Sequence, residues 1–270
     1  MAEAQRSDRV KELADKASLA PRHLLEPYFK ESAKEILVGL ARNQNLSERD
    51  FLRLLERKDL PAEVIREIAG RKEVAGQYSV RLAIARHPRT PRLISLPILK
   101  FLYVFDLLRV VQTPAVPANV KMVAEDAILK KAETLPRGEK ISLARRGSGR
   151  VVAGLLVTID RELIQAGLDN PFLTEAHLLK LLALEAVLPL LVQLIAHHPK
   201  WSYRYYVRLA LIRNPNTPLQ QVLAFLPHMA VNDLRDICLD RRMPEQVRSY
   251  IVAHCTERLA RPPRLSLPHE

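Results

Sequence analysis

The chain has 270 residues, of which 48% are hydrophobic and 27% charged, as is ordinary for a soluble protein long enough to bury a core. Its two cysteines, Cys238 and Cys255, argue against a disulfide framework and fit a reducing compartment, so we expect a cytoplasmic protein. The first eight residues lack an apolar core, and we expect no signal peptide there.

The formal net charge of +12 is the strongest indication of function in the composition. A basic surface attracts nucleic acid, anionic lipid or an acidic protein through its long-range field. Because 42 basic residues stand against 30 acidic ones, most charges are expected to be balanced locally. The charge therefore suggests an anionic partner without distinguishing nucleic acid from protein.

The first helices are predicted at 8–18 and 22–41, separated by Pro21, which cannot continue a helix. Tyr28 and Phe29 are expected to fold in beneath them. We interpret residues 1–33 as an N-terminal helical cap.

One motif occurs twice, at 80–91 and 207–218, and reads Val-Arg-Leu-Ala-x-x-Arg-x-Pro-x-Thr-Pro. The same offset of 127 residues gives 18 identities in 58 positions between 34–91 and 161–218. These matches predict an internal duplication. We place copy 1 at 34–121, bridging helices at 122–160, copy 2 at 161–248, and a C-terminal cap with a loose tail at 249–270, all in one continuous domain.

Each copy of the motif predicts the end of one helix and the start of the next. A residue before proline is disfavoured in the α region, so helices are expected to end at His87 and Asn214. Threonine is a good N-cap and proline suits the first helical position, so new helices are expected at Thr90-Pro91 and Thr217-Pro218. Weaker start signals occur at Ser47, Pro61, Pro117, Thr174 and Pro244.

Short helical units that bury their apolar faces against one another are typical of a solenoid. The stretch 206–223, Tyr-Val-Arg-Leu-Ala-Leu-Ile-Arg-Asn-Pro-Asn-Thr-Pro-Leu-Gln-Gln-Val-Leu, resembles the leucine-rich repeat variant of the HEAT/armadillo-like α-solenoids. The likeness is closest at 195–223 and 68–99. The resemblance implies an all-α, short right-handed α-solenoid that acts as an interaction scaffold. The iron–sulfur cysteine cluster of the founding type is not implied, because no cysteine precedes Cys238.

Two long apolar runs, 93–111 and 178–196, raise the question of a membrane span. Each contains charged residues, which are costly to place at the centre of a bilayer, so we do not expect a membrane span. Their counterparts at the offset of 127 are more polar and lie nearer the chain ends, so we interpret both runs as buried middle units of a stack. The run 151–159 looks like a strand, but we predict a buried helix there.

No catalytic or metal-binding spacing is present in the sequence, and we expect no enzyme activity and no cofactor. His197-His198 looks like a metal pair. However, adjacent helical residues point about 100° apart, and His198 holds the helix-ending place before Pro199. Cys238 and Cys255 are interpreted as small core residues.

Several cations are candidates for binding an anion. Arg145, Arg146 and Arg150 surround a Gly-Ser-Gly turn, which would either cradle an anion or form a solvated connection between helices. Arg81 and Arg208 occupy equivalent places in the two copies. They are expected either to pair with a carboxylate on the next helix or to form a basic stripe.

The most distinctive local patch, at 200–208, mixes aromatic and cationic residues, as single-stranded nucleic acid or a protein partner would require. Of its aromatic residues, only Tyr205 has an aromatic counterpart in copy 1, Tyr78, so both of these tyrosines are expected in the core. The additions in copy 2 serve either binding or thicker packing, and the candidate binding residues here are Trp201, Tyr203, Arg204, Tyr206 and Arg208.

Two classes of function follow. The first is a non-enzymatic scaffold that binds a protein partner. The alternative is a nucleic-acid binder, conceivably similar to the HEAT-like glycosylases that act on alkylated DNA, although their catalytic aromatic and acidic residues have no place on this chain.

Overall fold

The computed structural model describes residues 2–239, 243 and 245–260, which form helices and turns without any strand. The predicted all-α class is therefore confirmed for this part of the chain. The chain divides into two compact units, here called unit 1 (Met1–Thr134) and unit 2 (Leu135–Glu270), which we describe separately. The start expected at Pro244 and the tail expected at 261–268 lie outside the described residues.

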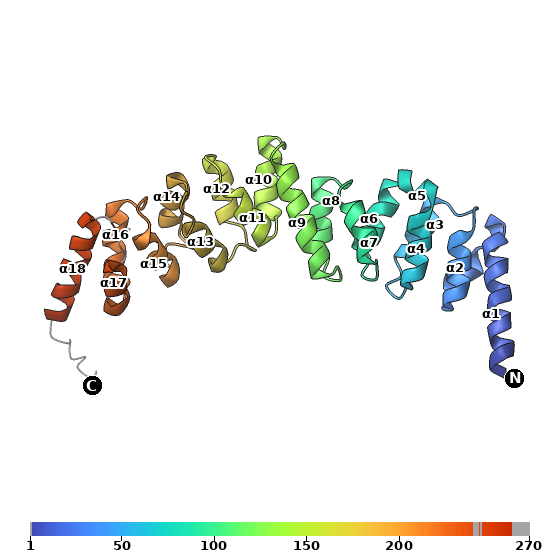
Figure 1. Ribbon diagram of the computed structural model, residues 1–270. Coiled ribbons are helices and arrows are strands. Elements are labelled where there is room, and N and C mark those ends of the chain that lie inside the picture. The colour runs from blue at the N-terminus through green and yellow to red at the C-terminus, as the bar shows by residue number, and fades with distance from the viewer. Residues whose placement is uncertain (1, 240–242, 244, 261–270) are drawn as a thin grey trace, which may run out of the picture. The chain divides into compact units, whose positions relative to one another are not determined.

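In unit 1 the helices lie beside one another in chain order, from blue to green in Figure 1. Helix α1 packs on α2, α2 on α4, α3 on α6, and α8 on α9. Their bounds are α1 (Ala2–Leu19), η1 (Arg22–Leu24), η2 (Glu26–Lys30), α2 (Lys34–Arg42), α3 (Glu48–Leu55), α4 (Ala62–Gly70), α5 (Lys72–Gly76), α6 (Tyr78–Arg86), α7 (Arg92–Leu99), α8 (Val104–Gln112) and α9 (Ala118–Ala132).

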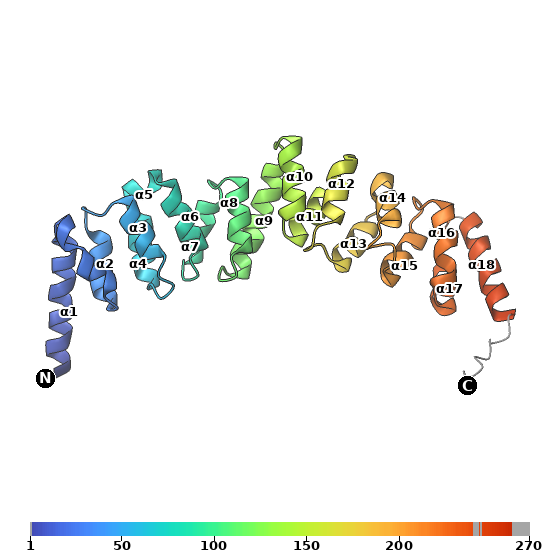
Figure 2. The same ribbon diagram turned by 180° about the vertical axis from the view of Figure 1, so that it is seen from behind.

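Unit 2 has the same kind of arrangement, which Figure 2 shows from the opposite side. Helix α10 packs on α12, α12 on α14, α13 on α15, and α17 on α18. Their bounds are α10 (Arg137–Arg146), α11 (Gly149–Leu155), α12 (Arg161–Leu168), α13 (Glu175–Leu182), α14 (Pro189–His197), α15 (Tyr205–Arg213), α16 (Leu219–Phe225), η3 (Leu226–His228), α17 (Val231–Cys238) and α18 (Glu245–Ala260).

Each unit has its own apolar core. In unit 1, the side chains of Phe51, Ile65 and Ile84 are no more than 1% exposed. In unit 2, Trp201 is the largest buried side chain and packs in one cluster with residues from α11 to α18. Phe29 is buried as expected, while Tyr28 is half-buried beside it.

The helix predicted at 22–41 is wrong over 22–33 and is confirmed over 34–41 by α2. The chain forms two 3-10 turns there, η1 and η2, before α2 begins at Lys34. Pro27 explains the interruption, because it lacks an amide hydrogen and its ring clashes with the preceding turn of an α-helix. The helix predicted at 151–159 is confirmed over α11, which ends at Leu155.

Helix ends at proline are confirmed, but the role assigned to threonine is wrong. Helices α6 and α15 end just before His87 and Asn214, as predicted. The N-caps of the next helices are Pro91 and Pro218, with extended backbone. The hydroxyl of Thr90 instead donates to the carbonyl of Ile84 at 2.6 Å, and the matching bond in unit 2 has the same length. Threonine thus closes the preceding helix, whose last carbonyls lack partners.

Helix starts that are marked by serine or threonine without a proline are confirmed as predicted. Ser47 forms a capping box with Asp50 at the start of α3, and Thr174 forms one with His177 at the start of α13. Each box satisfies amide groups that the first helical turn leaves without partners.

Buried asparagines tie helices together in both units. The Asn43 amide donates to the carbonyls of Ala17 and Ala20, each at 2.8 Å, and so holds the end of α1 against the end of α2. The Asn170 amide donates in the same way to Ala144 and Gly147 in unit 2. Since buried carbonyls are costly to leave unpaired, these bonds fix where the paired helices stop.

Tyrosine hydroxyls make a second tie in each unit. The Tyr78 hydroxyl donates to Asp106 at 2.6 Å and accepts from the amide of Tyr103 at 3.0 Å. The Tyr205 hydroxyl donates to Asp233 and accepts from the amide of Ala230. Both tyrosines are half-buried, and their hydroxyl groups join the start of one helix to the start of another.

We expect the Tyr78 tie to make stability depend on alkaline pH. Burial, followed by the bond to Asp106, raises the pKa of Tyr78 to about 12. The unfolded phenol titrates near 10, so the contribution to stability is complete below pH 10 and is lost as the pH rises through about 12. Urea unfolding followed by circular dichroism between pH 9 and 12 should show a steeper loss for the natural protein than for Tyr78→Phe.

Tyr250→Phe, which removes a phenol of unit 2 that is 47% exposed, is the matched control and should keep the natural slope. Equal slopes for Tyr78→Phe and the natural protein would contradict the proposed linkage.

Candidate partner-binding surface

The candidate surface is built where α14 ends and α15 begins. Helix α14 stops at His197 because Pro199 follows, and His198 caps it as predicted. The His198 ring lies 3.1 Å from the Asp169 carboxylate and accepts from the amide of Lys200 through its other nitrogen. The chain then makes a turn at 199–203 before α15 starts at Tyr205.

Trp201 lies under this turn rather than on it. Its side chain is 2% exposed, and its indole nitrogen donates to the carbonyl of Leu168 at 2.8 Å. The ammonium group of Lys200 lies 4.2 Å from the ring centroid. Trp201 therefore belongs to the core of unit 2, in agreement with the packing alternative, and is withdrawn from the candidate binding residues.

The neighbouring aromatic residues are exposed. Tyr203 is 75% exposed and Tyr206 is 62% exposed. The Tyr206 ring packs edge-on against Tyr205 at 5.6 Å, and Tyr205 is itself held by Asp233. The prediction that Tyr205 lies in the core is confirmed only in part, because this residue is half-buried.

The cations of the same segment lie among these rings. The guanidinium carbon of Arg208 is 5.4 Å from the Tyr203 ring and 5.6 Å from the Phe225 ring, and its Nε donates to the carbonyl of Ser202 at 2.5 Å. Arg204 is exposed one residue before α15. We call this group the α15 surface, and it consists of Lys200, Tyr203, Arg204, Tyr206 and Arg208.

Two carboxylates border the α15 surface, that of Asp169 beside His198 and that of Asp233 bonded to Tyr205, and few others lie near it in the sequence. Between Glu185 and Asp233 the chain contains no aspartate or glutamate, although it contains the cations of the α15 surface and Arg213. The helices α14, α15 and α16 thus supply no carboxylate to neutralise the surface. This gap in the acidic residues is visible in the sequence and is a signal that the search for motifs missed.

The cations at 145–150 do not join that surface. Arg145 lines a hollow of about 470 Å³ together with two acidic residues, Glu162 and Asp169. In the turn itself, the Ser148 hydroxyl accepts from the amide of Val151, and Gly149 is packed against Phe172 and His177. Exposed Arg146 and Arg150 flank this packed turn. The geometry resembles a helix connection more than an anion cradle.

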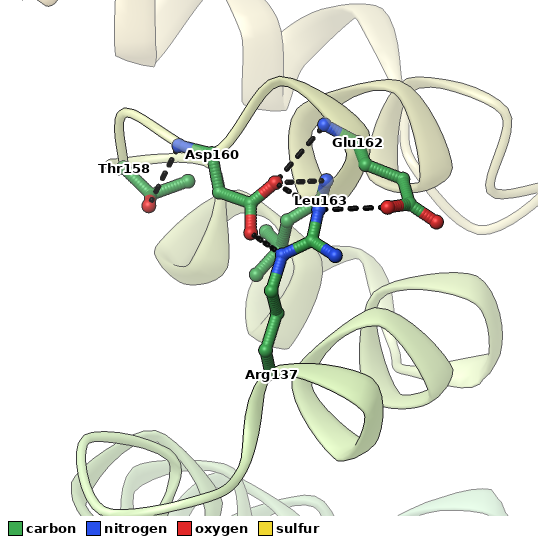
Figure 3. Close-up of polar contacts among 5 residues, drawn as sticks. All are labelled: Arg137, Thr158, Asp160, Glu162 and Leu163. Carbon is green, nitrogen blue, oxygen red and sulfur yellow. Dashed lines mark hydrogen bonds and ion pairs between the residues drawn. The ribbon is translucent and has the colours of Figure 1, made fainter.

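Arg137, which the sequence analysis did not single out, forms ion pairs with two carboxylates in unit 2 (Figure 3). Its guanidinium lies 2.6 Å from Asp160 and 2.7 Å from Glu162. Asp160 in turn caps α12 by accepting from the amides of Glu162 and Leu163. The bond to Arg137 lowers the pKa of Asp160. This cluster ties α10 to the start of α12 and is neutralised within the chain.

Arg81 and Arg208 share a position but neither expected role describes them fully. Within the described part of the chain, neither pairs with a carboxylate; both contact aromatic rings, that of Phe101 in the case of Arg81. The two free cysteines lie near each other in unit 2, where Cys255 is buried and Cys238 half-buried, and burial raises the pKa of Cys238.

Among the described residues there is no group of three or more histidine, cysteine or acidic side chains placed to hold a metal ion. None of the helices in 2–239 and 245–260 has the length and apolar character needed to cross a bilayer. Comparison of the chain with protein-family models, with curated proteins and with solved structures gave no match.

Proposed function

We propose that each unit is a short α-solenoid of the HEAT or leucine-rich-variant type and that the two units are copies of one ancestral unit. The support lies in the helix boundaries. Helices α2, α3, α4, α6, α7, α8 and α9 begin at 34, 48, 62, 78, 92, 104 and 118, and helices of unit 2 begin 127 residues later at 161, 175, 189, 205, 219, 231 and 245.

The ties between helices recur with the same spacing. The Asn43 and Asn170 bonds, the Tyr78 and Tyr205 bonds, and the Thr90 and Thr217 bonds each join residues that correspond at this offset. Side chains that a scaffold needs for its own construction are expected to recur in this way.

We further propose that the protein is a non-enzymatic scaffold whose α15 surface binds an acidic segment of a partner protein. The observation that carries this proposal is the pair of exposed tyrosines among unneutralised cations. At the places of Lys200, Tyr203, Arg204 and Tyr206, unit 1 has Glu73, Gly76, Gln77 and Ser79, so the fold itself does not require these four residues. Exposed tyrosine and arginine are the residue types that dominate the energetics of protein interfaces.

Single-stranded nucleic acid is the second candidate for the same surface. Bases stack on exposed tyrosine rings, and cations with few acidic neighbours attract phosphates. This alternative uses the same residues but predicts a different salt dependence. This alternative concerns binding of nucleic acid alone and does not include glycosylase chemistry.

The test is a titration of the whole protein with two fluorescein-labelled probes. One is a peptide that alternates glutamate with phenylalanine, and the other is an oligo-dT strand. We expect the peptide to bind, and the double variant Tyr203→Ala/Tyr206→Ala to weaken its binding by about tenfold or more, because two anchoring rings are lost. Tyr250→Ala, which removes a tyrosine that is 47% exposed elsewhere in unit 2, should leave the affinity unchanged.

The nucleic-acid candidate would be favoured if oligo-dT bound more tightly than the peptide. Its affinity should then fall steeply as the salt concentration rises and depend on the same two tyrosines. If the double variant and the natural protein bound both probes with equal affinity, the α15 surface would be excluded as the binding site.

A further inference from the structure

Unit 1 contains an apolar hollow with one cation in its wall. Its volume is about 380 Å³, and helices α4 to α7 supply the lining. Arg81 is the only charged residue that lines it. The others are Ala69, Val74, Ile84, Pro97, Ile98 and Phe101.

Arg81 has an unsatisfied donor in this wall. Its Nε atom is buried and has no hydrogen-bond partner, and within the described residues no carboxylate pairs with the guanidinium. A buried donor without an acceptor carries an unrecovered desolvation cost. Helices α6 and α7 contain no acidic residue, and the carboxylates of α4 and α5 pair elsewhere, Glu63 with Lys34, Glu67 with Arg42 and Glu73 with Arg71.

The equivalent arginine in unit 2 shows what is missing. The Nε of Arg208 donates to the carbonyl of Ser202, and the guanidinium contacts the rings of Tyr203 and Phe225. The carbonyl is free to accept because the chain makes a turn at 199–203, whereas unit 1 has helix α5 at this place. Gly76 stands where unit 2 has Tyr203.

In unit 1 the Nε atom of Arg81 therefore has no bonded acceptor, and no ring takes the place of Tyr203. Arg81 contacts a single ring, that of Phe101, at 5.7 Å. Phe101 is 65% exposed, so the hollow is open to solvent at this edge. A ligand that carries an anionic oxygen and an aromatic ring would supply from outside what Ser202 and Tyr203 supply within unit 2.

We propose that this hollow binds the C-terminal aromatic residue of a partner polypeptide. The terminal carboxylate accepts from Arg81, which is suited to carboxylates by its planar fork of donors. The aromatic ring packs on Phe101, Ile98 and Pro97, and the open edge leaves room for the rest of the chain. The site lies in the other unit from the α15 surface and stands independently of it.

The test uses the full chain and a fluorescein-labelled Gly-Ala-Ala-Phe peptide, prepared with a free C-terminal carboxylate or with a C-terminal amide. We expect the acid to bind at least tenfold more tightly than the amide. Arg81→Gln should abolish this preference. Arg86→Gln, which changes an exposed arginine on the same helix outside the hollow, should keep it.

A second variant fills the site instead of removing its charge. A side chain at Gly76 would meet nothing within 4 Å of its Cβ, so Gly76→Tyr is expected to fold and to place a ring beside Arg81, as Tyr203 is placed beside Arg208. This variant should lose binding of the acid while keeping the circular dichroism spectrum. The double variant of the α15 surface should bind the acid normally, which separates failure of one site from failure of the other.

Equal binding of the acid and the amide would overturn the assignment to a chain end. Displacement of the acid by an equal concentration of 3-phenylpropionate would place a free aromatic acid in the hollow and overturn the polypeptide as occupant. Failure of both peptides to bind would also overturn the proposal. It would indicate that Arg81 is satisfied by Gln77, one helical turn earlier, whose buried side-chain oxygen also lacks a partner.

Discussion

Replacing Trp201 with alanine is expected to lower the free energy of unfolding of unit 2 by about 3–5 kcal/mol. Trp201 is the largest fully buried side chain, and its removal opens a cavity in the cluster formed by helices α11 to α18. The change also leaves the carbonyl of Leu168 without its partner. Urea unfolding followed by far-ultraviolet circular dichroism measures the loss.

Two variants provide the comparison for this prediction. Trp201→Phe keeps a ring in place but loses the bond to Leu168, so we expect a smaller loss than for alanine. Tyr203→Ala removes an exposed ring two residues later and should change stability by no more than about 0.5 kcal/mol. A loss at Trp201→Ala no larger than at Tyr203→Ala would contradict the burial of the indole.

Because Trp201 is the only tryptophan in the chain, its fluorescence reports on unit 2 alone, whereas circular dichroism reports on both units. If the two signals change at different urea concentrations in the natural protein, the units unfold as separate steps, and the loss must be assigned to the step that fluorescence follows.

Gly39→Ala is expected to destabilise unit 1 by about 3 kcal/mol or more, at the upper end of the usual cost of overpacking. A Cβ on Gly39 would lie 2.2 Å from the carbonyl oxygen of Ala14, so backbone would meet backbone and α1 would have to move away from α2. These two helices form the most extensive helix contact in unit 1. Thermal or urea unfolding of the full chain measures the effect.

Gly70→Ala is the matched control, because a Cβ there meets nothing within 4 Å and the residue is also helical. It should be neutral or stabilising by up to about 1 kcal/mol, since alanine loses less conformational freedom than glycine in a helix. Similar stabilities for the two alanine variants would mean that α1 does not lie as close to α2 as described.

Much of the fold could be predicted from local sequence signals. Helix ends before proline and the capping boxes at Ser47 and Thr174 depend only on neighbouring residues, and they were confirmed. The role of Thr90 could not be predicted this way. Its hydroxyl can satisfy either the next helix or the preceding one, and only the path of the chain shows that it turns back to Ile84.

The candidate sites were less predictable because they depend on contacts between helices. Comparing the two halves of the sequence isolated Tyr203 and Tyr206 as additions, and both are exposed. The same comparison isolated Trp201, but no sequence signal showed that its indole reaches the carbonyl of Leu168. The hollow beside Arg81 depends on a helix in one unit where the other has a turn, and on how α4 to α7 pack together.

The ties between helices also bear on how such a chain folds and how its length can change. The asparagine bonds reach back 23 and 26 residues, and the bond from Trp201 reaches back 33. A native state held by contacts of such short sequence separation has a low contact order, which favours rapid folding because little loop entropy is lost before contacts form. Within each unit these ties join helices that lie close together in the chain, so adding helices at one end would leave the existing ties intact.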